Sequence, residues 1–375
     1  MEMEMNGVTT TNTITATTTT TSESQKKARL AILELAHMVS VPMSLVAVIR
    51  LKVPQAIWQG GSNTPISASQ ILAHICPHGG GYDAENLQRI LRLLASYNIF
   101  VEHLNSRGER KYSLTEIGKT LVDDTEGLSY AYYMLQHHQD ALMQAWPVME
   151  EAVKDPTAEP FKKANGEGAI SYYTKRPDEL KLAVKALCGM SIPLMREILD
   201  SYDGFQGVET LVDVGGNNGI SLRSIMEKYP NVSKGINFDL PEMVASAPHI
   251  PGVTHVGGDA FESVPSGDAI FIKWVLLAWT DEECKKVFQN CYKALPANGK
   301  VIACEPVAPE MTDESQRTRA LLGGDIFIMT MYRTKGKHRT EQQFKELATS
   351  AGFSRFHAFY VDPYMAVLEF HKSSI

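Results

Sequence analysis

The chain has 375 residues, enough for two domains that each bury a hydrophobic core. Its formal net charge of -7 leaves no basic field for phosphates, which argues against nucleic acid as a main partner. We find neither a signal peptide nor an apolar run of bilayer-spanning length, and therefore expect a cytoplasmic protein without a membrane partner.

The cysteines favour reduced thiols, because their number is odd and their spacing fits neither a zinc site nor a C-x-x-C motif. Cys284 and Cys291 lie seven residues apart, on one helical face, and we expect them to pack in a core. No metal site is predicted. The five cysteines are Cys76, Cys188, Cys284, Cys291 and Cys304.

Residues 1–27 are rich in threonine and contain few large apolar side chains, so we expect a disordered tail. A plastid transit peptide is the competing interpretation. Glu2, Glu4 and the shortage of arginine argue against it.

Residues 28–125 are predicted to form a mainly helical, winged-helix domain. ARLAILELAHMVSVPMSLVAVIRL is apolar on all sides, typical of a helix covered by several neighbours or by a second subunit, so we expect oligomerisation. Two further helices follow, the second with Asp83 as N-cap, and then two strands around an Arg-Gly turn. Arg89 and Arg92 would contact DNA if the domain were a regulator, but an acidic protein favours a packing or dimerisation role.

From about residue 200 to residue 375 strands and helices alternate, which predicts an α/β fold with a doubly wound, Rossmann-like sheet. Its strands are LVDVGG, GINFDL, VTHVGGD, DAIFIKWVLLAW and GKVIACEPV. Ligands of such sheets bind beyond the carboxyl ends of the strands. Residues 126–199 are predicted to be linking helices.

The loop of LVDVGGNNG is the predicted cofactor site, because Gly215 and Gly216 allow close approach of a ligand to a helix N-terminus. Asp239 ends the next strand, where an acid accepts hydrogen bonds from a ribose, and Asp259 ends the third, beside an adenine amine. With Asp213 these acids disfavour a pyrophosphate. They suit the ammonium and sulfonium charges of S-adenosyl-L-methionine, with a dehydrogenase or a nonfunctional relic as alternatives.

Assembled in this order and spacing, LVDVGGNNG, GINFDLP, HVGGDAF, FIKW, ALPANGKVI and GKHRTEQQF resemble plant methyltransferases of the caffeic-acid O-methyltransferase type. The resemblance runs from about Ala28 to the C-terminus. It implies a homodimer formed by the N-terminal helices, which with the linking helices would also cover the substrate pocket. It further implies cofactor contacts from Gly215, Gly216, Asp239, Leu240, Asp259, Ala260 and Lys273.

FIKWVLLAW departs from that family. O-methylating members carry a His-Asp pair after the strand, whose His removes the phenol proton and is held by two Glu residues. The matching positions here are Leu277 and Ala278, with Glu305 as the first Glu and His338 in place of the second. A phenol with a pKa near 10 needs a base, whereas a pyridine nitrogen already has a free lone pair at neutral pH. We therefore expect no catalytic base and an N-methyltransferase.

Within the family, the chain is most similar to the nicotinate N-methyltransferases of plants, which implies nicotinate as substrate and N-methylnicotinate (trigonelline) as product. The predicted substrate contacts are His137, Leu277, Ala278, Glu305, Met329, Arg333 and His338. Of these, Arg333 and His338 precede a helix whose capping pattern is Thr340 with Gln343, a favourable place for a carboxylate. A solvated basic loop is the alternative for Arg333.

The sequence is also compatible with two other functions. One is an O-methyltransferase, acting on a phenol or catechol, in which another residue such as His338 has replaced the base. The other is a DNA-binding or scaffolding protein built on an inactive enzyme, which the intact glycines and acids disfavour.

Overall fold

The computed structural model describes residues 15–333 and 335–372. The chain divides into two compact units, Met1–Gly127 and Leu128–Ile375, and each is described by itself. The predicted boundary between domains, at residues 125 and 126, lies close to this division.

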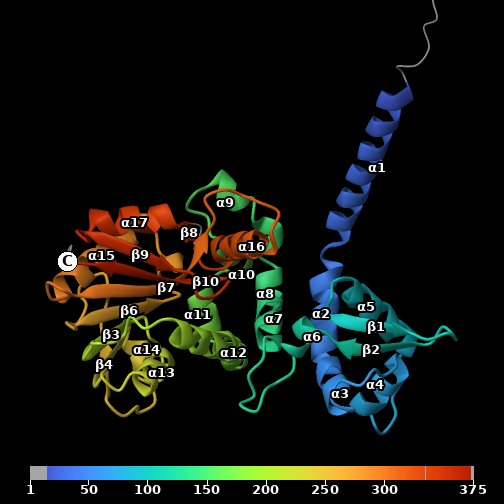
Figure 1. Ribbon diagram of the computed structural model, residues 1–375, viewed down its shortest axis with the longest axis horizontal. Coiled ribbons are helices and arrows are strands. Elements are labelled where there is room, and N and C mark those ends of the chain that lie inside the picture. Colours follow the sequence, from blue (N-terminus) through green and yellow to red (C-terminus); the bar gives the residue numbers. More distant parts are fainter. Residues whose placement is uncertain (1–14, 334, 373–375) are drawn as a thin grey trace, which may run out of the picture. The chain divides into compact units, whose positions relative to one another are not determined.

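The first unit is mainly helical, with one hairpin (Figure 1). Asp83 accepts hydrogen bonds from the Glu85 and Asn86 amides and so caps its helix, as the sequence predicts. The antiparallel hairpin that follows turns at residues 105–109. The elements are α1 (Thr15–His37), α2 (Ser40–Arg50), α3 (Val53–Gln59), α4 (Ala68–Ile75), α5 (Ala84–Ser96), β1 (Phe100–Leu104), β2 (Arg110–Leu114) and α6 (Glu116–Lys119).

The N-terminal segment differs from two expectations. Helix α1 begins at Thr15, so residues 15–27 of the predicted disordered tail are helical; residues 1–14 lie outside the described part. A helix satisfies its backbone hydrogen bonds internally and needs no core of its own, and the side chains of residues 22–40 are indeed exposed. The segment Ser22–Arg50 is also long and apolar enough to span a membrane by length and composition, contrary to our expectation. A turn at residues 38–39 divides it into α1 and α2.

The second unit contains a mixed sheet in the order β5-β4-β3-β6-β7-β10-β9, with β8 paired to β7. The strands from β5 to β7 are parallel, and β10 runs antiparallel to β7 and β9, which confirms the predicted α/β architecture. These strands are β3 (Thr210–Val214), β4 (Lys234–Asp239), β5 (Val253–Gly257), β6 (Ala269–Lys273), β7 (Lys300–Ala308), β8 (Arg339–Thr340), β9 (Arg355–Phe359) and β10 (Met365–His371).

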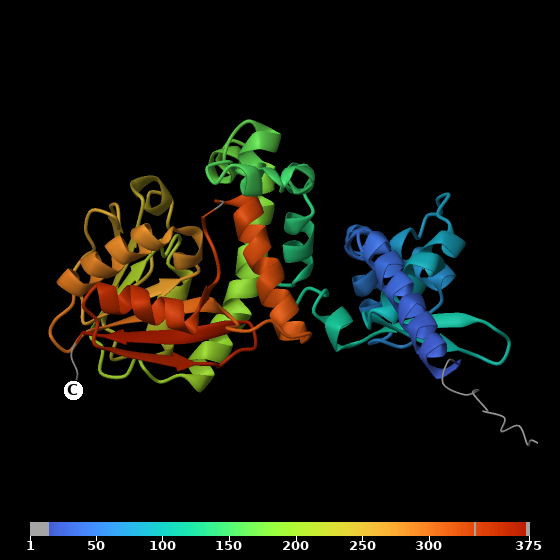
Figure 2. The ribbon, with the colours of Figure 1, turned by 90° about the horizontal axis from the view of Figure 1, so that it is seen from above.

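Helices cover both faces of this sheet (Figures 1 and 2). The N-terminal group of this unit consists of α7 (Ala131–His137), α8 (Asp140–Met143), α9 (Glu151–Lys154), α10 (Pro160–Asn165), α11 (Ala169–Thr174), α12 (Pro177–Ser201) and the 3-10 turn η1 (Trp146–Val148). Between and after the strands lie α13 (Ile220–Lys228), α14 (Pro241–Val244), η2 (Leu276–Ala278), α15 (Asp281–Ala294), α16 (Gln316–Met331) and α17 (Glu341–Ser350).

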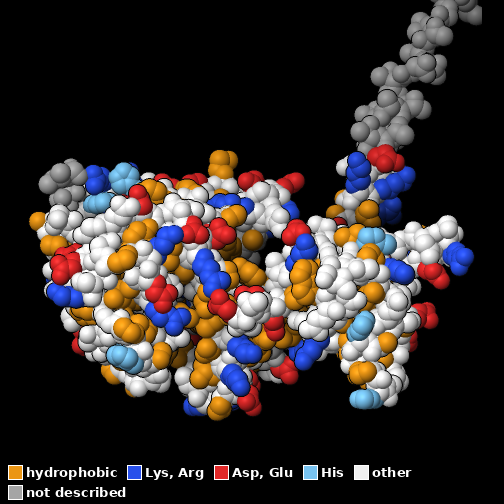
Figure 3. Space-filling model, turned by 60° about the horizontal axis from the view of Figure 1, so that its bottom comes forward, with side chains coloured by type: hydrophobic (Ala, Val, Ile, Leu, Met, Phe, Trp, Pro, Cys, Tyr) orange, Lys and Arg blue, Asp and Glu red, His pale blue; other side chains and the backbone are white. Residues whose placement is uncertain are grey.

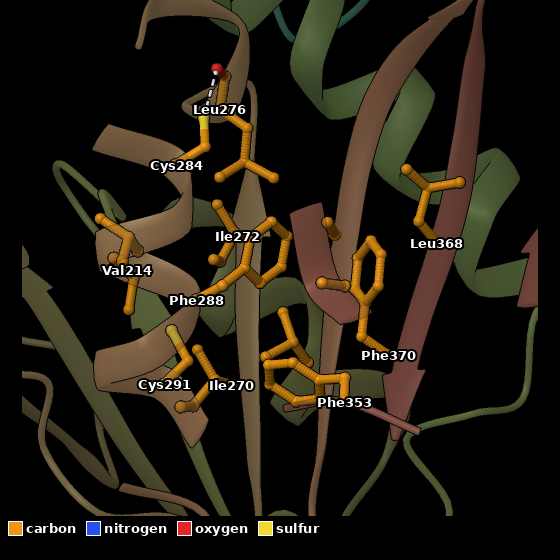
Figure 4. Packing of buried hydrophobic residues seen from close by; sticks show 14 of the residues in the cluster. Val214, Ile270, Ile272, Leu276, Cys284, Phe288, Cys291, Phe353, Leu368 and Phe370 are labelled. Carbon is orange, nitrogen blue, oxygen red and sulfur yellow. Dashed lines mark hydrogen bonds between the residues drawn. The ribbon is translucent and has the colours of Figure 1, made fainter. Parts of the chain in front are cut away.

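Alternation along the strands separates two cores. Val212 and Ile270 belong to the core under α15 and α17, whereas Leu211 and Phe271 belong to the core under α12 and α13. Cys284 and Cys291 lie in the first core among Val214, Ile272 and Phe288, which confirms the packing role predicted for these thiols (Figure 4). On the displayed face of this unit, basic and acidic side chains are interspersed (Figure 3).

The predicted strand DAIFIKWVLLAW is too long. β6 ends at Lys273, Trp274 adopts a left-handed backbone with φ of 58°, and residues 276–278 form the turn η2. A left-handed residue cannot continue an extended strand, so the chain leaves the sheet there. The consequence is a compact turn at the carboxyl end of the sheet.

Candidate active site

The glycine-rich loop joins β3 to α13 at the carboxyl edge of the sheet. Gly215 has φ of 75°, Asn217 of 51° and Gly219 of 77°. At position 216 a Cβ atom would lie 2.1 Å from the Asn237 amide oxygen and 2.7 Å from Asp213 Oδ2, so only glycine fits. The loop therefore presents bare backbone to the space above the sheet.

A first cavity, which we call the glycine pocket, lies along this loop and against α12. Lys273 borders it and donates a 2.6 Å hydrogen bond to Ser191 on α12. Burial lowers the pKa of Lys273, and the Asp213 carboxylate opposes that effect. The pocket is lined by Val184, Leu187, Cys188, Ser191, Asp213, Gly215, Gly216, Asn217, Asn218, Ile220, Ser221, Lys273, Trp274 and Val275.

Asp213 is the acid of the glycine pocket and is only 2% exposed. Among the described residues its Oδ2 atom has no hydrogen-bond partner. Burial raises the pKa of Asp213 to about 7, although Lys273 acts to lower it. An unpaired buried carboxylate of this kind suits a cationic ligand.

A second cavity, the aspartate pocket, shares Gly215 and Val275 with the first. Asp239 stands at the end of β4; its Oδ2 accepts from the Asn217 amide at 2.9 Å, and its Oδ1 from the Leu240 amide at 2.7 Å. The pocket thus brings together two of the predicted acids, Asp239 and Asp259, and their neighbours Leu240 and Ala260. Its lining residues are Val214, Gly215, Phe238, Asp239, Leu240, Gly258, Asp259, Ala260, Phe261, Val275 and Trp279.

Asn237 and His255 support the glycine loop from below, a feature that the sequence analysis did not find. Asn237 Nδ2 donates to the Asn217 carbonyl at 2.8 Å and to His255 Nδ1 at 2.9 Å. His255 Nε2 bonds to the Pro248 carbonyl at 3.0 Å. Because His255 is the partner on a neighbouring strand, no local sequence pattern could have revealed this network.

The turn η2 carries Leu277 and Ala278, the positions where a general base was expected to be absent. Leu277 is 8% exposed and its carbonyl faces Gly336, where a Cβ atom would approach it to 2.9 Å. Glu305 is fully buried, and burial raises its pKa to about 7. Its Oε1 atom accepts from the Val275 and Leu276 amides, so Glu305 contacts the backbone of the turn.

Arg333 and His338 do not present free cations to this region. Arg333 Nη1 lies 2.9 Å from both carboxylate oxygens of Glu283, at the start of α15. The capping box of Thr340 with Gln343 forms as predicted. His338 is buried, its amide donates to Asp325 Oδ1, and burial lowers the pKa of its ring to about 4, so it is neutral at pH 7.

His137 and Met329 lie in the helical part of the unit, on α7 and α16. The His137 ring stacks on Phe327, with ring centroids 4.1 Å apart, and its Nδ1 bonds to the Tyr133 carbonyl at 2.9 Å. Burial lowers the pKa of His137 to about 4. Met329 is half-buried. The roles of these residues toward a substrate stay predictions.

Comparison with known proteins agrees with this architecture. The sequence profile of an O-methyltransferase domain matches residues 146–354, and that of an O-methyltransferase dimerisation domain matches residues 33–124. Nicotinate N-methyltransferase 1 of Glycine max is 67% identical over 92% of this chain and 97% of its own length. The Arabidopsis thaliana protein of the same name is 62% identical, with the same coverage of both chains. A methyltransferase of calicheamicin biosynthesis, solved in its SAH-bound form, has a TM-score of 0.77 at 23% identity, covering 92% of this chain and 98% of that one.

The fold and the two joined pockets therefore define an S-adenosylmethionine-dependent methyltransferase. The unpaired Asp213 oxygen, the bare glycine loop and Asp239 fit a ligand that carries both positive charge and a ribose. More particularly, the chain belongs to the plant O-methyltransferase family, and its dimerisation domain supports a homodimer.

Proposed function

We propose that the protein transfers a methyl group to the ring nitrogen of nicotinate, giving N-methylnicotinate, without a general base from the protein. The observation that carries the proposal is η2: Leu277 and Ala278 stand beside intact cofactor pockets and can accept no proton. The names of the two relatives compared above support nicotinate as the substrate.

The chain's own residues have simple tasks in this reaction. When bound, the cofactor supplies an electrophilic methyl group. Asp213 and Asp239 would hold it, and the backbone of the glycine loop would approach it closely. Leu277 would offer an apolar surface to a flat ring and exclude water. The pyridine lone pair needs only orientation and desolvation, since no proton has to leave the nitrogen.

The test uses methyl-labelled S-adenosylmethionine and acceptors matched in shape. Nicotinate and 3-hydroxybenzoate both carry a carboxylate on a six-membered ring, but one offers a nitrogen and the other a phenol; benzoate offers neither. We expect label in N-methylnicotinate alone. Preference for the phenol, or for a catechol, would overturn the proposal and make the O-methyltransferase the better assignment.

The pH dependence of the rate distinguishes the two chemistries as well. Protonation removes the lone pair of the pyridine, so kcat/KM should decline on the acid side with the pKa of the free substrate. A heterocycle of different basicity should shift that limb correspondingly. These rates are measured with S-adenosylmethionine saturating at every pH, so that the ionisation of Asp213 does not contribute. A limb that then stays in place when the acceptor changes would show that a group of the protein accepts the proton in catalysis.

A further inference from the structure

The turn of residues 275–279 is held by two buried ionisable side chains that approach it from different elements. On one side Glu305, from β7, accepts hydrogen bonds from the Val275 and Leu276 amides, both 2.9 Å long. Glu305 is fully buried. Its Oε1 atom is thus occupied by backbone and has no side-chain partner among the described residues.

On the other side Arg339, the first residue of β8, is also fully buried. It donates to the Leu276 carbonyl through Nη1 and to the Trp279 carbonyl through Nη2, each at 2.7 Å, and to Asp281 Oδ1 through Nε at 2.8 Å. The Cys284 thiol adds a 3.3 Å contact to the same Leu276 carbonyl (Figure 4). Both ends of the turn are therefore bonded.

This turn borders both cavities and carries Leu277, the predicted apolar contact of the acceptor. Val275 lines both pockets, and Trp279 lines the aspartate pocket. Between them stands Leu277, against which the loop before β8 packs at Gly336. A shift of the turn would move the cofactor wall and the apolar wall together.

We propose that Glu305 and Arg339 are positioning residues, which fix the turn of residues 275–279 so that acceptor and cofactor meet in a reactive alignment. The inference rests on the proposed function and revises the predicted substrate contact of Glu305. Buried polar groups are costly unless they form hydrogen bonds. Here Glu305 Oε1 and the Arg339 guanidinium bond to the backbone of the turn, whereas Glu305 Oε2 has no hydrogen-bond partner among the described residues. A misplacement of about 1 Å can cost roughly a hundredfold in rate, so such rigidity acts on catalysis.

The experiment compares Glu305→Gln, Glu305→Leu and Arg339→Lys in the full-length protein, with Lys337→Met as the control. Lys337 pairs with the same Asp281 as Arg339 does but donates to no carbonyl of the turn. For each variant kcat is divided by the number of sites that bind S-adenosylmethionine in calorimetry. Unfolded protein then does not lower the value.

Glutamine keeps an oxygen that can accept from both amides, whereas leucine keeps none. We expect the kcat of Glu305→Gln to be at least about tenfold higher than that of Glu305→Leu. Arg339→Lys should lower kcat about tenfold while the KM for the acceptor changes by less than about threefold. Lys337→Met should match the unaltered protein.

Two results would overturn the inference. If Glu305→Gln is as slow as Glu305→Leu, Glu305 acts through its charge or its proton. If Arg339→Lys keeps the full kcat per binding site, Arg339 serves stability alone, and this variant decides the matter should Glu305→Leu not fold. All rates are measured with whichever acceptor the unaltered protein methylates, so inactivity toward nicotinate overturns the proposed function and leaves this comparison valid.

Discussion

Binding of S-adenosylmethionine below pH 7 should release a proton from Asp213. This carboxyl is buried in the glycine pocket with one oxygen unpaired, and burial raises its pKa to about 7. A cationic ligand favours the ionised form and lowers that pKa on binding. Asp213→Asn removes the titrating proton and should abolish the release.

The size of the effect follows from the raised pKa. At pH 8 most Asp213 is ionised and ready for the ligand, whereas at pH 6 about nine molecules in ten must first lose a proton. Affinity should therefore fall about tenfold between pH 8 and pH 6, or about 1.4 kcal/mol. At pH 8 the Asn variant should bind more weakly than the wild type by about 1.5 to 3 kcal/mol, the usual loss for a hydrogen bond to a charged group.

Calorimetry at pH 6 in buffers of different ionisation enthalpy counts the protons released. Glu305→Gln is the matched control, because Glu305 is a second buried carboxyl with a pKa raised to about 7 but lines neither pocket. We expect nearly one proton for the wild type and the control, and none for Asp213→Asn. A wild-type count of zero, or a count lost only in the control, would refute the reasoning.

Three further predictions concern the acceptor side and stability. Leu277→His with Ala278→Asp should not speed N-methylation, because a polar pair beside an apolar ring adds desolvation cost; a tenfold rise in kcat/KM for the pyridine would contradict this. If Arg333 leaves Glu283 to bind the substrate carboxylate, Arg333→Ala should raise the KM for nicotinate but not the KM for its amide. Glu283→Gln, which frees Arg333, should lower the KM for nicotinate. Unchanged KM values in both variants would show that another residue binds the carboxylate. Burial raises the pKa of Glu305 to about 7, so its contribution to the free energy of unfolding is fully present below about pH 4.5 and is lost as the pH rises through 7. In denaturant titrations the free energy of unfolding of Glu305→Gln should therefore rise by about 2 to 3 kcal/mol relative to that of the wild type between pH 5 and pH 8. A constant difference across that range would exclude titration of Glu305.

Local patterns predicted well wherever neighbours along the chain decide the structure. Asp83 and Thr340 cap their helices as expected, because each cap needs only residues within one turn. Asp239 and Asp259 line one pocket because parallel strands end at one edge of the sheet, which the alternation of strands and helices already implies.

Local sequence patterns could not predict the contacts between segments that lie far apart in the chain. Arg333 looked like a free cation at a helix N-terminus, but its partner Glu283 lies 50 residues earlier in the chain. Ser191 accepts a hydrogen bond from Lys273 across 82 residues, and the left-handed backbone of Trp274 ends the strand earlier than the apolar run predicts. A basic residue in a polar loop is normally solvated, whereas Arg339 is fully buried and bonded to carbonyls of the turn of residues 275–279.

The glycine pocket has a cysteine on its wall. Cys188 is half-buried on the pocket wall, Cys76 is half-buried in the other unit, and the three remaining cysteines are buried. Burial raises the pKa of Cys188, so a smaller share of its thiol is present as the reactive thiolate. Cys76 lines neither pocket, so a cofactor bound in the glycine pocket should slow alkylation of Cys188 and leave that of Cys76 unchanged, which would measure cofactor occupancy without a mutation or a turnover event.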